Sequence, residues 1–231
     1  MGMIYNNLQT VRAQIGAACA QCGRNPDEVA LLAVSKTMAA DAVRQAYAAG
    51  QRQFGENYIQ EGVDKVQQLA DLDGVVWHMI GPIQSNKTRD VAAHFDWVHS
   101  IDRLKIAQRL AEQRPAHLPP LNVCIQVNID GGINKSGVVP SDALALALQV
   151  QALPQLQLRG IMAIPEPTTD LIANSLVFAS VKALFFDLKT QCADMDTLSM
   201  GMSADMQAAI SQGSTMVRVG TAIFGQRPAK V

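Results

Sequence analysis

Apolar positions along the chain follow two spacings. In the first segment they recur every three or four residues, at Ile4, Leu8, Val11, Ile15 and Ala18, which predicts one face of an amphipathic helix. Residues 23–26 contain Gly, Asn and Pro, which end that pattern. From residue 29 onward, short apolar runs typical of strands alternate with amphipathic helical patterns.

Eight of the short apolar runs have strand character. They cover residues 29–34, 53–54, 75–80, 97–99, 121–128, 158–164, 197–200 and 216–219. Helical patterns fill the intervals, at residues 39–49, 59–69, 86–93, 102–113, 141–152, 178–188 and 204–212. Strands alternating with helices in a chain of 231 residues predict an α/β fold: one (β/α)8 TIM-type barrel domain over residues 1–231, with an extra N-terminal helix.

An open doubly wound sheet is the alternative α/β fold. Such a sheet usually places its phosphate-binding glycines after the first strand, whereas the best candidates here, Gly201 and Gly220, follow the last two strands. Loops after the seventh and eighth strands form phosphate sites in many barrels, so the barrel is favoured.

Composition excludes several classes of protein. Hydrophobic residues make up 48% of the chain and charged residues 17%, which supplies enough apolar surface for a buried core. The formal net charge is −1 without a long basic tract, so neither nucleic acid nor an anionic membrane surface is an expected partner. No apolar run approaches the ~18 residues of a membrane span, and the amino terminus lacks a signal pattern. We therefore expect a cytoplasmic protein and, without sustained heptads, a monomer.

The four cysteines predict neither a disulfide framework nor a metal site. Cys19 and Cys22 have the spacing of metal ligands, but the pair ends an amphipathic helix and no second pair follows. Cys124 lies in an apolar run and is expected to be a reduced core residue.

Candidate chemistry begins with Lys36, which closes the first apolar strand. A lysine at the end of a buried strand can be desolvated until its amine is nucleophilic, as a Schiff base requires. Near the other end of the chain, Ser203 and the pair Gly220 and Thr221 lie in loops that run into helices, where backbone N–H groups bind phosphate. Together these residues suggest a phosphorylated aldehyde held on Lys36, namely pyridoxal 5'-phosphate (PLP).

Each of these residues also has a purely structural interpretation. Lys36 could be a solvated charge, and Gly220 could serve a tight turn. Ser203 could cap a helix that begins at Ala204. His78 lies in an apolar strand and is predicted to be a hydrogen-bonded core histidine.

Four motifs in order give the chain a family resemblance. They are FGENY at residues 54–58, HMIGPIQSNK at 78–87, SMGMS at 199–203 and RVGTAIFG at 218–225. On these motifs the chain resembles the pyridoxal phosphate homeostasis proteins, which share a barrel with the N-terminal domain of bacterial alanine racemases. The resemblance extends from residue 33 to residue 225.

The resemblance implies a set of cofactor-binding residues: Lys36, Asn57, Met162, Ser203, Arg218, Gly220 and Thr221. The lysine would form the Schiff base, and the serine, glycine and threonine would hold the phosphate. The arginine would face the pyridine nitrogen, and the asparagine and methionine would flank the ring. A guanidinium cannot accept a proton, so it would leave the ring nitrogen unprotonated and the ring a weak electron sink.

One loop departs from the family pattern. Residues 128–137 keep Lys135 and Gly137 but lack the acidic residue that the family often has three positions before the lysine. A charge pair within this loop is therefore not expected.

Two functions fit a barrel with this cofactor. A racemase needs a proton donor on each face of its substrate, and none of the three tyrosines, Tyr5, Tyr47 and Tyr58, is placed as a second donor beside Lys36. The chain also ends soon after the last predicted unit, which leaves no second domain to cover the barrel mouth. The resemblance implies the other function, homeostasis of PLP (vitamin B6). Such a protein binds PLP reversibly and buffers or delivers it to apo-enzymes, without substantial turnover. A barrel with a structural lysine and another phosphate ligand is the third alternative.

Overall fold

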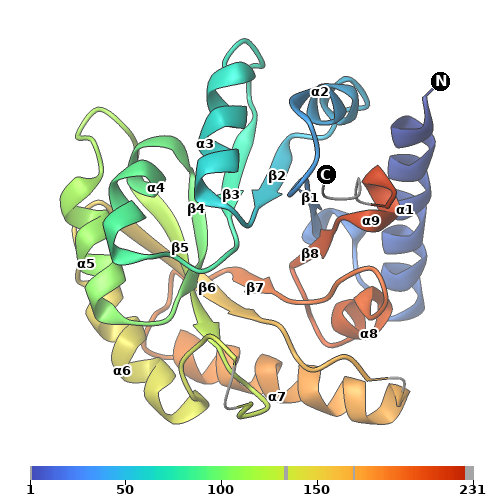
Figure 1. Ribbon diagram of the computed structural model, residues 1–231. Helices are drawn as coiled ribbons and strands as arrows, with labels where there is room; N and C mark the ends of the chain where they lie inside the picture. The colour runs from blue at the N-terminus through green and yellow to red at the C-terminus, as the bar shows by residue number, and fades with distance from the viewer. Residues whose placement is uncertain (1, 133–134, 169, 227–231) are drawn as a thin grey trace.

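The core of the molecule is a closed barrel of parallel strands (Figure 1). The computed structural model describes residues 2–132, 135–168 and 170–226. The strands are β1 (Ala30–Val34), β2 (Gln53–Glu56), β3 (Val76–Met79), β4 (Trp97–Ile101), β5 (Leu121–Val127), β6 (Leu156–Ala163), β7 (Thr197–Ser199) and β8 (Met216–Val219). All eight predicted strands are confirmed, and the closed order excludes the open sheet.

Helices surround the barrel. They are α1 (Met3–Gln21), α2 (Ala40–Ala48), α3 (Ile59–Gln68), α4 (Thr88–His94), α5 (Leu104–Gln113), α6 (Pro140–Gln151), α7 (Leu171–Lys189), α8 (Met206–Ser211) and α9 (Thr221–Phe224), with 3-10 turns η1 (Pro26–Glu28) and η2 (Ser85–Lys87). Each longer helix buries one stripe: in α5, for example, Ile106 and Leu110 face the core. Within the described chain, no helix combines the length and apolar character that crossing a membrane requires.

The barrel closes where the first strand meets the last. β1 pairs with β8 in a register that sets Leu32 beside Arg218 and Ala33 beside Val219. On its other side β1 pairs with β2, with Val34 beside Gly55. The carboxyl ends of β1, β2 and β8 therefore come together, although they lie far apart in the sequence.

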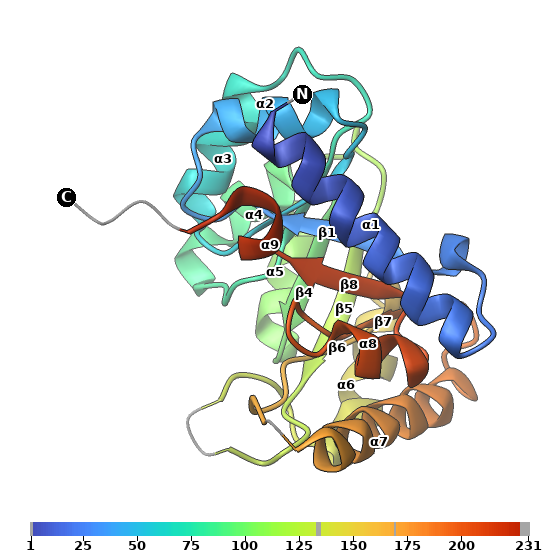
Figure 2. The same cartoon turned by 90° about the vertical axis from the view of Figure 1, so that its right-hand side faces the viewer.

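The N-terminal helix covers this closure from outside. α1 buries its predicted stripe, from Ile4 to Ala18, and contacts α8 and α9. Figure 2 shows α1 running across β8 with α8 and α9 beside it. The extra helix thus packs on the outside of the barrel, over the junction of the first and last strands.

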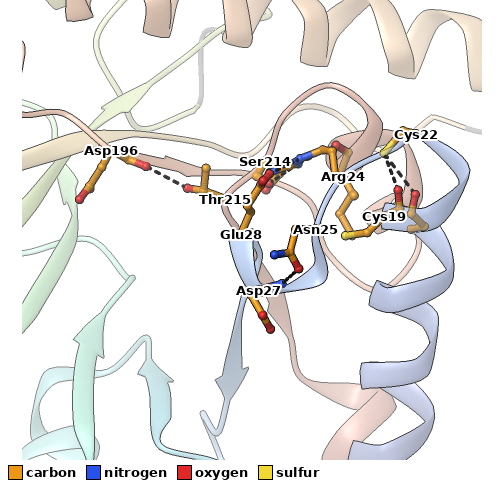
Figure 3. A network of polar contacts seen from close by, with 11 residues as sticks. Cys19, Cys22, Arg24, Asn25, Asp27, Glu28, Asp196, Ser214 and Thr215 are labelled. Carbon is orange, nitrogen blue, oxygen red and sulfur yellow. Dashed lines mark hydrogen bonds and ion pairs between the residues drawn. The ribbon is translucent and has the colours of Figure 1, made fainter.

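Arg24 ties the N-terminal segment to the last unit at the base of the barrel (Figure 3). Its Nη1 donates hydrogen bonds to the carbonyl oxygens of Ile210 and Ser214, at 2.9 and 2.7 Å. Nearby, the Cys22 thiol donates to carbonyl oxygens of α1, including that of Cys19 at 3.4 Å. Both cysteines are free.

Candidate functional site

A pocket lies at the carboxyl ends of the strands, where β1 meets β8. Its volume is about 320 Å³, and it is lined by Val34, Lys36, Asn57, Ile80, Ile164, Met202, Ser203, Ala204, Arg218, Gly220 and Thr221. Every predicted cofactor residue except Met162 is among these. Residues that follow or end β1, β2, β3, β6, β7 and β8 therefore converge on one cavity, as expected for a barrel mouth.

Met162 occupies a different place. It is fully buried in β6, paired with Gln126 of β5 and Ser199 of β7, and does not line the pocket. Ile164, the first residue after β6, lines the pocket instead and is 40% exposed. With Val34 and Ile80, it supplies an apolar wall that the sequence prediction did not assign.

Exposure changes across the pocket. Arg218 is only 4% exposed and forms the floor, while Lys36 is half-buried. Ser203 and Thr221 are exposed at the rim. The pocket thus has a buried cationic floor, apolar walls and a solvated hydroxyl rim.

Two glycines allow backbone segments to approach at this site. A Cβ on Gly220 would lie 3.2 Å from the carbonyl oxygen of Val34, so the turn after β8 packs closely against the end of β1. A Cβ on Gly81 would lie 2.1 Å from the carbonyl oxygen of Asn57, which is too short for any side chain. Gly81 therefore lets the loop after β3 hold Asn57 at the pocket.

Lys36 follows a residue that is fixed by a buried ion pair. Ser35 donates from Oγ to Glu56 Oε1 at 2.6 Å, and its carbonyl accepts a hydrogen bond from Lys65 Nζ at 2.7 Å. Lys65 Nζ also lies 2.8 Å from Glu56 Oε1. The side chains of Glu56 and Lys65 are both buried, so buried groups fix the backbone just before Lys36.

The residue after Lys36 is held by the same cluster. The Thr37 N–H donates to Glu61 Oε1 at 2.5 Å, and Lys65 Nζ contacts the same oxygen at 2.6 Å. Thr37 has φ of 65°, a left-handed conformation that is strained for a β-branched residue. Glu61 and Lys65 are four apart on α3, so one turn of helix fixes the strained residue.

Burial dominates the electrostatics of this cluster. It raises the pKa of Glu56, while the ammonium of Lys65 and the hydroxyl of Ser35 act in the opposite direction. Lys65 and Ser35 therefore offset part of the cost of burying the carboxylate, and the ion pair needs both members.

Arg218 is anchored by neutral acceptors. Its Nη1 donates to the carbonyl oxygen and to the Oγ of Ser199, both at 2.8 Å, and its Nη2 donates to the carbonyl oxygen of Ala163 at 2.9 Å. Burial lowers its pKa to about 10, so the guanidinium remains protonated at neutral pH. It can only donate to a group that faces it from the pocket.

The loop that carries Ser203 differs from the prediction. α8 begins at Met206 with Asp205 at the N-cap position, so Ser203 does not cap a helix starting at Ala204. Asp205 instead accepts the N–H of Met202 at 2.5 Å and closes the turn that contains Ser203.

The helix expected after the loop at Gly220 is present and short. α9 begins at Thr221, with Gly220 at its N-cap position, and the Ile223 and Phe224 N–H groups donate to the Gly220 carbonyl oxygen. The Thr221 and Ala222 N–H groups precede any intrahelical acceptor, so they can donate to an anion beside Thr221.

The loop after β5 corrects another expectation. Lys135 does form a charge pair within the loop, because its Nζ lies 2.8 Å from Asp130 Oδ2, and it also lies 3.1 Å from Glu166 Oε1. The partner is five positions before the lysine instead of three. A second pocket of about 220 Å³, lined by Asn128 and Lys135, adjoins the first.

The structure also bears on His78, on the tyrosines and on possible metal ligands. His78 Nδ1 lies 2.9 Å from His99 Nε2, but its Nε2 has no hydrogen-bond partner among the residues that the structure describes. The prediction of a hydrogen-bonded core histidine therefore holds for one ring nitrogen. None of the pocket-lining residues is a tyrosine. Across the described ranges, His, Cys, Asp and Glu side chains form no group that could hold a metal ion.

Comparisons with known proteins agree with one another. Residues 6–228 match the family model described as "Alanine racemase, N-terminal domain". A pyridoxal phosphate homeostasis protein of Pseudomonas aeruginosa is 59% identical over 227 residues, which cover 98% of this chain and 97% of the relative. The protein of that name in Escherichia coli K12 is 56% identical over 229 residues, 98% of each chain.

Solved structures give the same fold. PipY of Synechococcus elongatus PCC7942, determined with PLP bound, superposes with a TM-score of 0.84 at 37% identity, covering 96% of this chain and all of the other. An alanine racemase from Corynebacterium glutamicum superposes with a TM-score of 0.72 at 16% identity, covering 99% of this chain and 62% of the racemase. At that identity the likeness concerns the fold alone.

Proposed function

The chain belongs to the pyridoxal phosphate homeostasis proteins, within the family of the alanine racemase N-terminal domain, and we propose that it binds PLP and maintains its intracellular supply. One observation carries this proposal: Lys36, Arg218 and the two rim residues Ser203 and Thr221 converge on one pocket of about 320 Å³.

The pocket residues fit the chemical features of PLP. A phosphate is anionic and strongly hydrated, which suits the exposed hydroxyls of Ser203 and Thr221 at the rim. A pyridine ring needs apolar walls, and Val34, Ile80 and Ile164 supply them. The ring nitrogen is an acceptor, and the buried guanidinium of the floor is a donor.

Each residue then has a defined task. Lys36 supplies the amine that holds the aldehyde carbon covalently, and the Glu56–Lys65 ion pair fixes the residue before it. Ser203 and Thr221 donate to the phosphate. Arg218 donates to the ring nitrogen and leaves it unprotonated. When bound, the cofactor supplies an electrophilic carbon and an electron-withdrawing ring, which the arginine makes weaker as an electron sink.

We further propose that the protein is a carrier without substantial turnover. None of the lining residues is a tyrosine that could donate a proton on the face opposite Lys36, and Tyr47 instead donates to the Asp73 carbonyl oxygen at 2.9 Å. The exposed rim suits reversible loading and transfer to PLP-dependent apo-enzymes. We propose that it does this in the cytoplasm, as a monomer.

Borohydride reduction tests the covalent site. The PLP-loaded protein should be yellow, and reduction should fix the cofactor to Lys36 in peptide mass maps. Lys36→Ala should lose the adduct but keep weak, non-covalent PLP binding, because the phosphate residues remain. Lys87→Ala, on the exterior beside Asp90, is the matched control and should label normally. An adduct only on Lys87 or Lys135 would refute the assignment.

Amino-acid turnover separates the carrier from the racemase. The loaded protein should show amino-acid-dependent spectral changes without consuming the amino acid. Racemisation of an L-amino acid at about 1 s⁻¹ or faster, abolished by Lys36→Ala, would establish the racemase instead.

A further inference from the structure

A row of buried polar side chains crosses the barrel interior and ends at Arg218. We call His78, His99 and Ser199 the histidine chain; they lie on β3, β4 and β7. His78 Nδ1 lies 2.9 Å from His99 Nε2, and His99 Nδ1 lies 3.1 Å from Ser199 Oγ. The same Oγ accepts from Arg218 Nη1 at 2.8 Å. All three members are fully buried.

Arg218 determines which atom donates and which accepts in each hydrogen bond of the histidine chain. Arg218 has only donors, so Ser199 Oγ must accept from it and has one hydrogen left to donate. His99 Nδ1 is the acceptor for that hydrogen. His99 must then carry its proton on Nε2 and donate to His78 Nδ1, which leaves His78 protonated on Nε2.

Both histidines are neutral, as this arrangement requires. Burial lowers the pKa of His78 to about 3, and burial together with His78 and Arg218 lowers the pKa of His99 well below its ordinary value. Each ring therefore carries a single proton at neutral pH. The reverse direction would leave the Ser199 hydroxyl hydrogen without an acceptor in the chain.

Filling the barrel interior with the histidine chain lowers the stability of the fold. It ends at His78 Nε2, a buried nitrogen that finds no hydrogen-bond partner within the described part of the protein, although the ring stacks on Trp97 with centroids 5.3 Å apart. A buried donor without an acceptor destabilises the fold, and apolar side chains would fill the space without that cost. A role in positioning Arg218 at the pocket floor explains why polar side chains occupy this space.

We propose that His99 is a positioning residue for the cofactor ring. Its Nδ1 takes the Ser199 hydroxyl hydrogen, so the lone pairs of Oγ face Arg218 and hold the guanidinium in one orientation at the pocket floor. His78 fixes the tautomer of His99. The inference rests on the proposed function, in which Arg218 donates to the ring nitrogen of PLP.

Substitutions at Ser199 and His99 test the connection to the ring. Full-length protein carrying Ser199→Ala or His99→Leu should bind PLP about tenfold more weakly. Ser199→Ala removes a charge-assisted contact of Arg218, and His99→Leu removes the acceptor that orients the Ser199 hydroxyl toward it. The ¹⁵N resonance of the pyridine nitrogen in labelled, bound PLP should also move. His99→Asn, whose Oδ1 can accept from Ser199, should restore both readouts. His94→Leu, on the exterior helix α4, is the control for loss of a histidine.

The outcomes distinguish this inference from the proposed function. If the unaltered protein failed to bind PLP, the proposed function would fall. If it bound PLP but folded Ser199→Ala and His99→Leu variants kept the same affinity and the same ring resonance, only the positioning role would be overturned.

A second measurement needs no cofactor. Ring ¹⁵N shifts of the PLP-free protein should show both histidines protonated on Nε2 and unprotonated on Nδ1. A proton on His99 Nδ1 would reverse the hydrogen bond to Ser199 and overturn the inference, even in a protein that binds PLP normally.

Discussion

At the scale of single residues, burial decides whether a substitution affects binding or stability. Ser203 and Thr221 are exposed, so replacing both with alanine should leave folding unchanged. The lost charge-assisted hydrogen bonds to phosphate are each worth about 1.5–3 kcal/mol, so PLP affinity should fall by more than tenfold. Equilibrium titration with PLP measures this.

A matched pair of exposed hydroxyls serves as the control for that double variant. Thr10 and Ser180 each donate to a carbonyl oxygen in their own helix, in α1 and α7. The Thr10→Ala and Ser180→Ala double variant should bind PLP normally. Equal affinities in the two double variants would mean that the phosphate lies elsewhere.

Buried histidines make the folded protein sensitive to acid. Burial lowers the pKa of His78 to about 3, whereas a histidine in the unfolded chain titrates near 6.5. Between those values the unfolded chain binds a proton that the folded chain does not, so the free energy of unfolding falls as the pH falls. His78→Phe, which keeps a ring against Trp97, should reduce this slope by about 1.4 kcal/mol per pH unit.

Urea unfolding at several pH values between about 4.5 and 7 measures that slope. His94→Phe, on the exterior, should leave it nearly unchanged. A His78→Phe variant with the full acid dependence of the unaltered protein would show that other groups cause it.

At the scale of elements, the Glu56–Lys65 pair joins β2 and α3 to the segment around Lys36. Lys65→Met would leave a buried carboxylate without its cation, which should cost about 3–5 kcal/mol at neutral pH. The pKa of Glu56 is already raised by burial and would rise further, so the variant should regain stability as falling pH protonates that group.

The double variant Lys65→Met and Glu56→Gln isolates the uncompensated charge. It should be more stable than Lys65→Met alone, since no buried ion remains without a partner. Replacing the exposed pair Arg44 and Asp71 in the same way should change stability little. Urea unfolding compares all of these, and a double variant no better than Lys65→Met would contradict the account.

Element positions followed from periodicity, and the errors lie where the pattern was short or ambiguous. α9 has four residues, too few to display a helical repeat, so the helix was expected from the loop at Gly220 and Thr221 and not from periodicity. At the start of α8, both Ser203 and Asp205 are good N-cap residues, and only the structure shows that Asp205 occupies the position.

The candidate site was predictable as far as strand ends determine it. Lys36 and Gly220 follow from the rule that residues at the carboxyl ends of barrel strands converge, whereas Arg218 was assigned from the family resemblance. Ile164 lines the pocket and Met162 does not, because β6 ends at Ala163. The apolar run in the sequence does not reveal where the strand ends. The contact between His78 and His99 depends on how β3 and β4 pair. The four-residue spacing of Glu61 and Lys65 is typical of an ordinary helix pair and does not reveal that Lys65 is buried against Glu56.

At the scale of the whole molecule, the pocket lies across the junction of the first and last strands. Lys36 follows β1, whereas Arg218 and Thr221 belong to β8 and the helix after it. These two strands are joined by the pairs between Ala30–Ala33 and Met216–Val219. The site is therefore complete only when the barrel is closed, and PLP should stabilise the closed form over any opened one.

Bound PLP would consequently act as a removable cross-link between the two ends of the chain. A covalent bond at Lys36 and hydrogen bonds at Thr221 would constrain positions 185 residues apart (221 − 36) in much the way a disulfide does. Native-state hydrogen exchange should slow most in β1 and β8 on loading, and least in β4 and β5 across the barrel. Pyridoxine phosphate, which has an alcohol in place of the aldehyde, should protect β1 less. Releasing the cofactor to another protein would then also loosen the junction that held it.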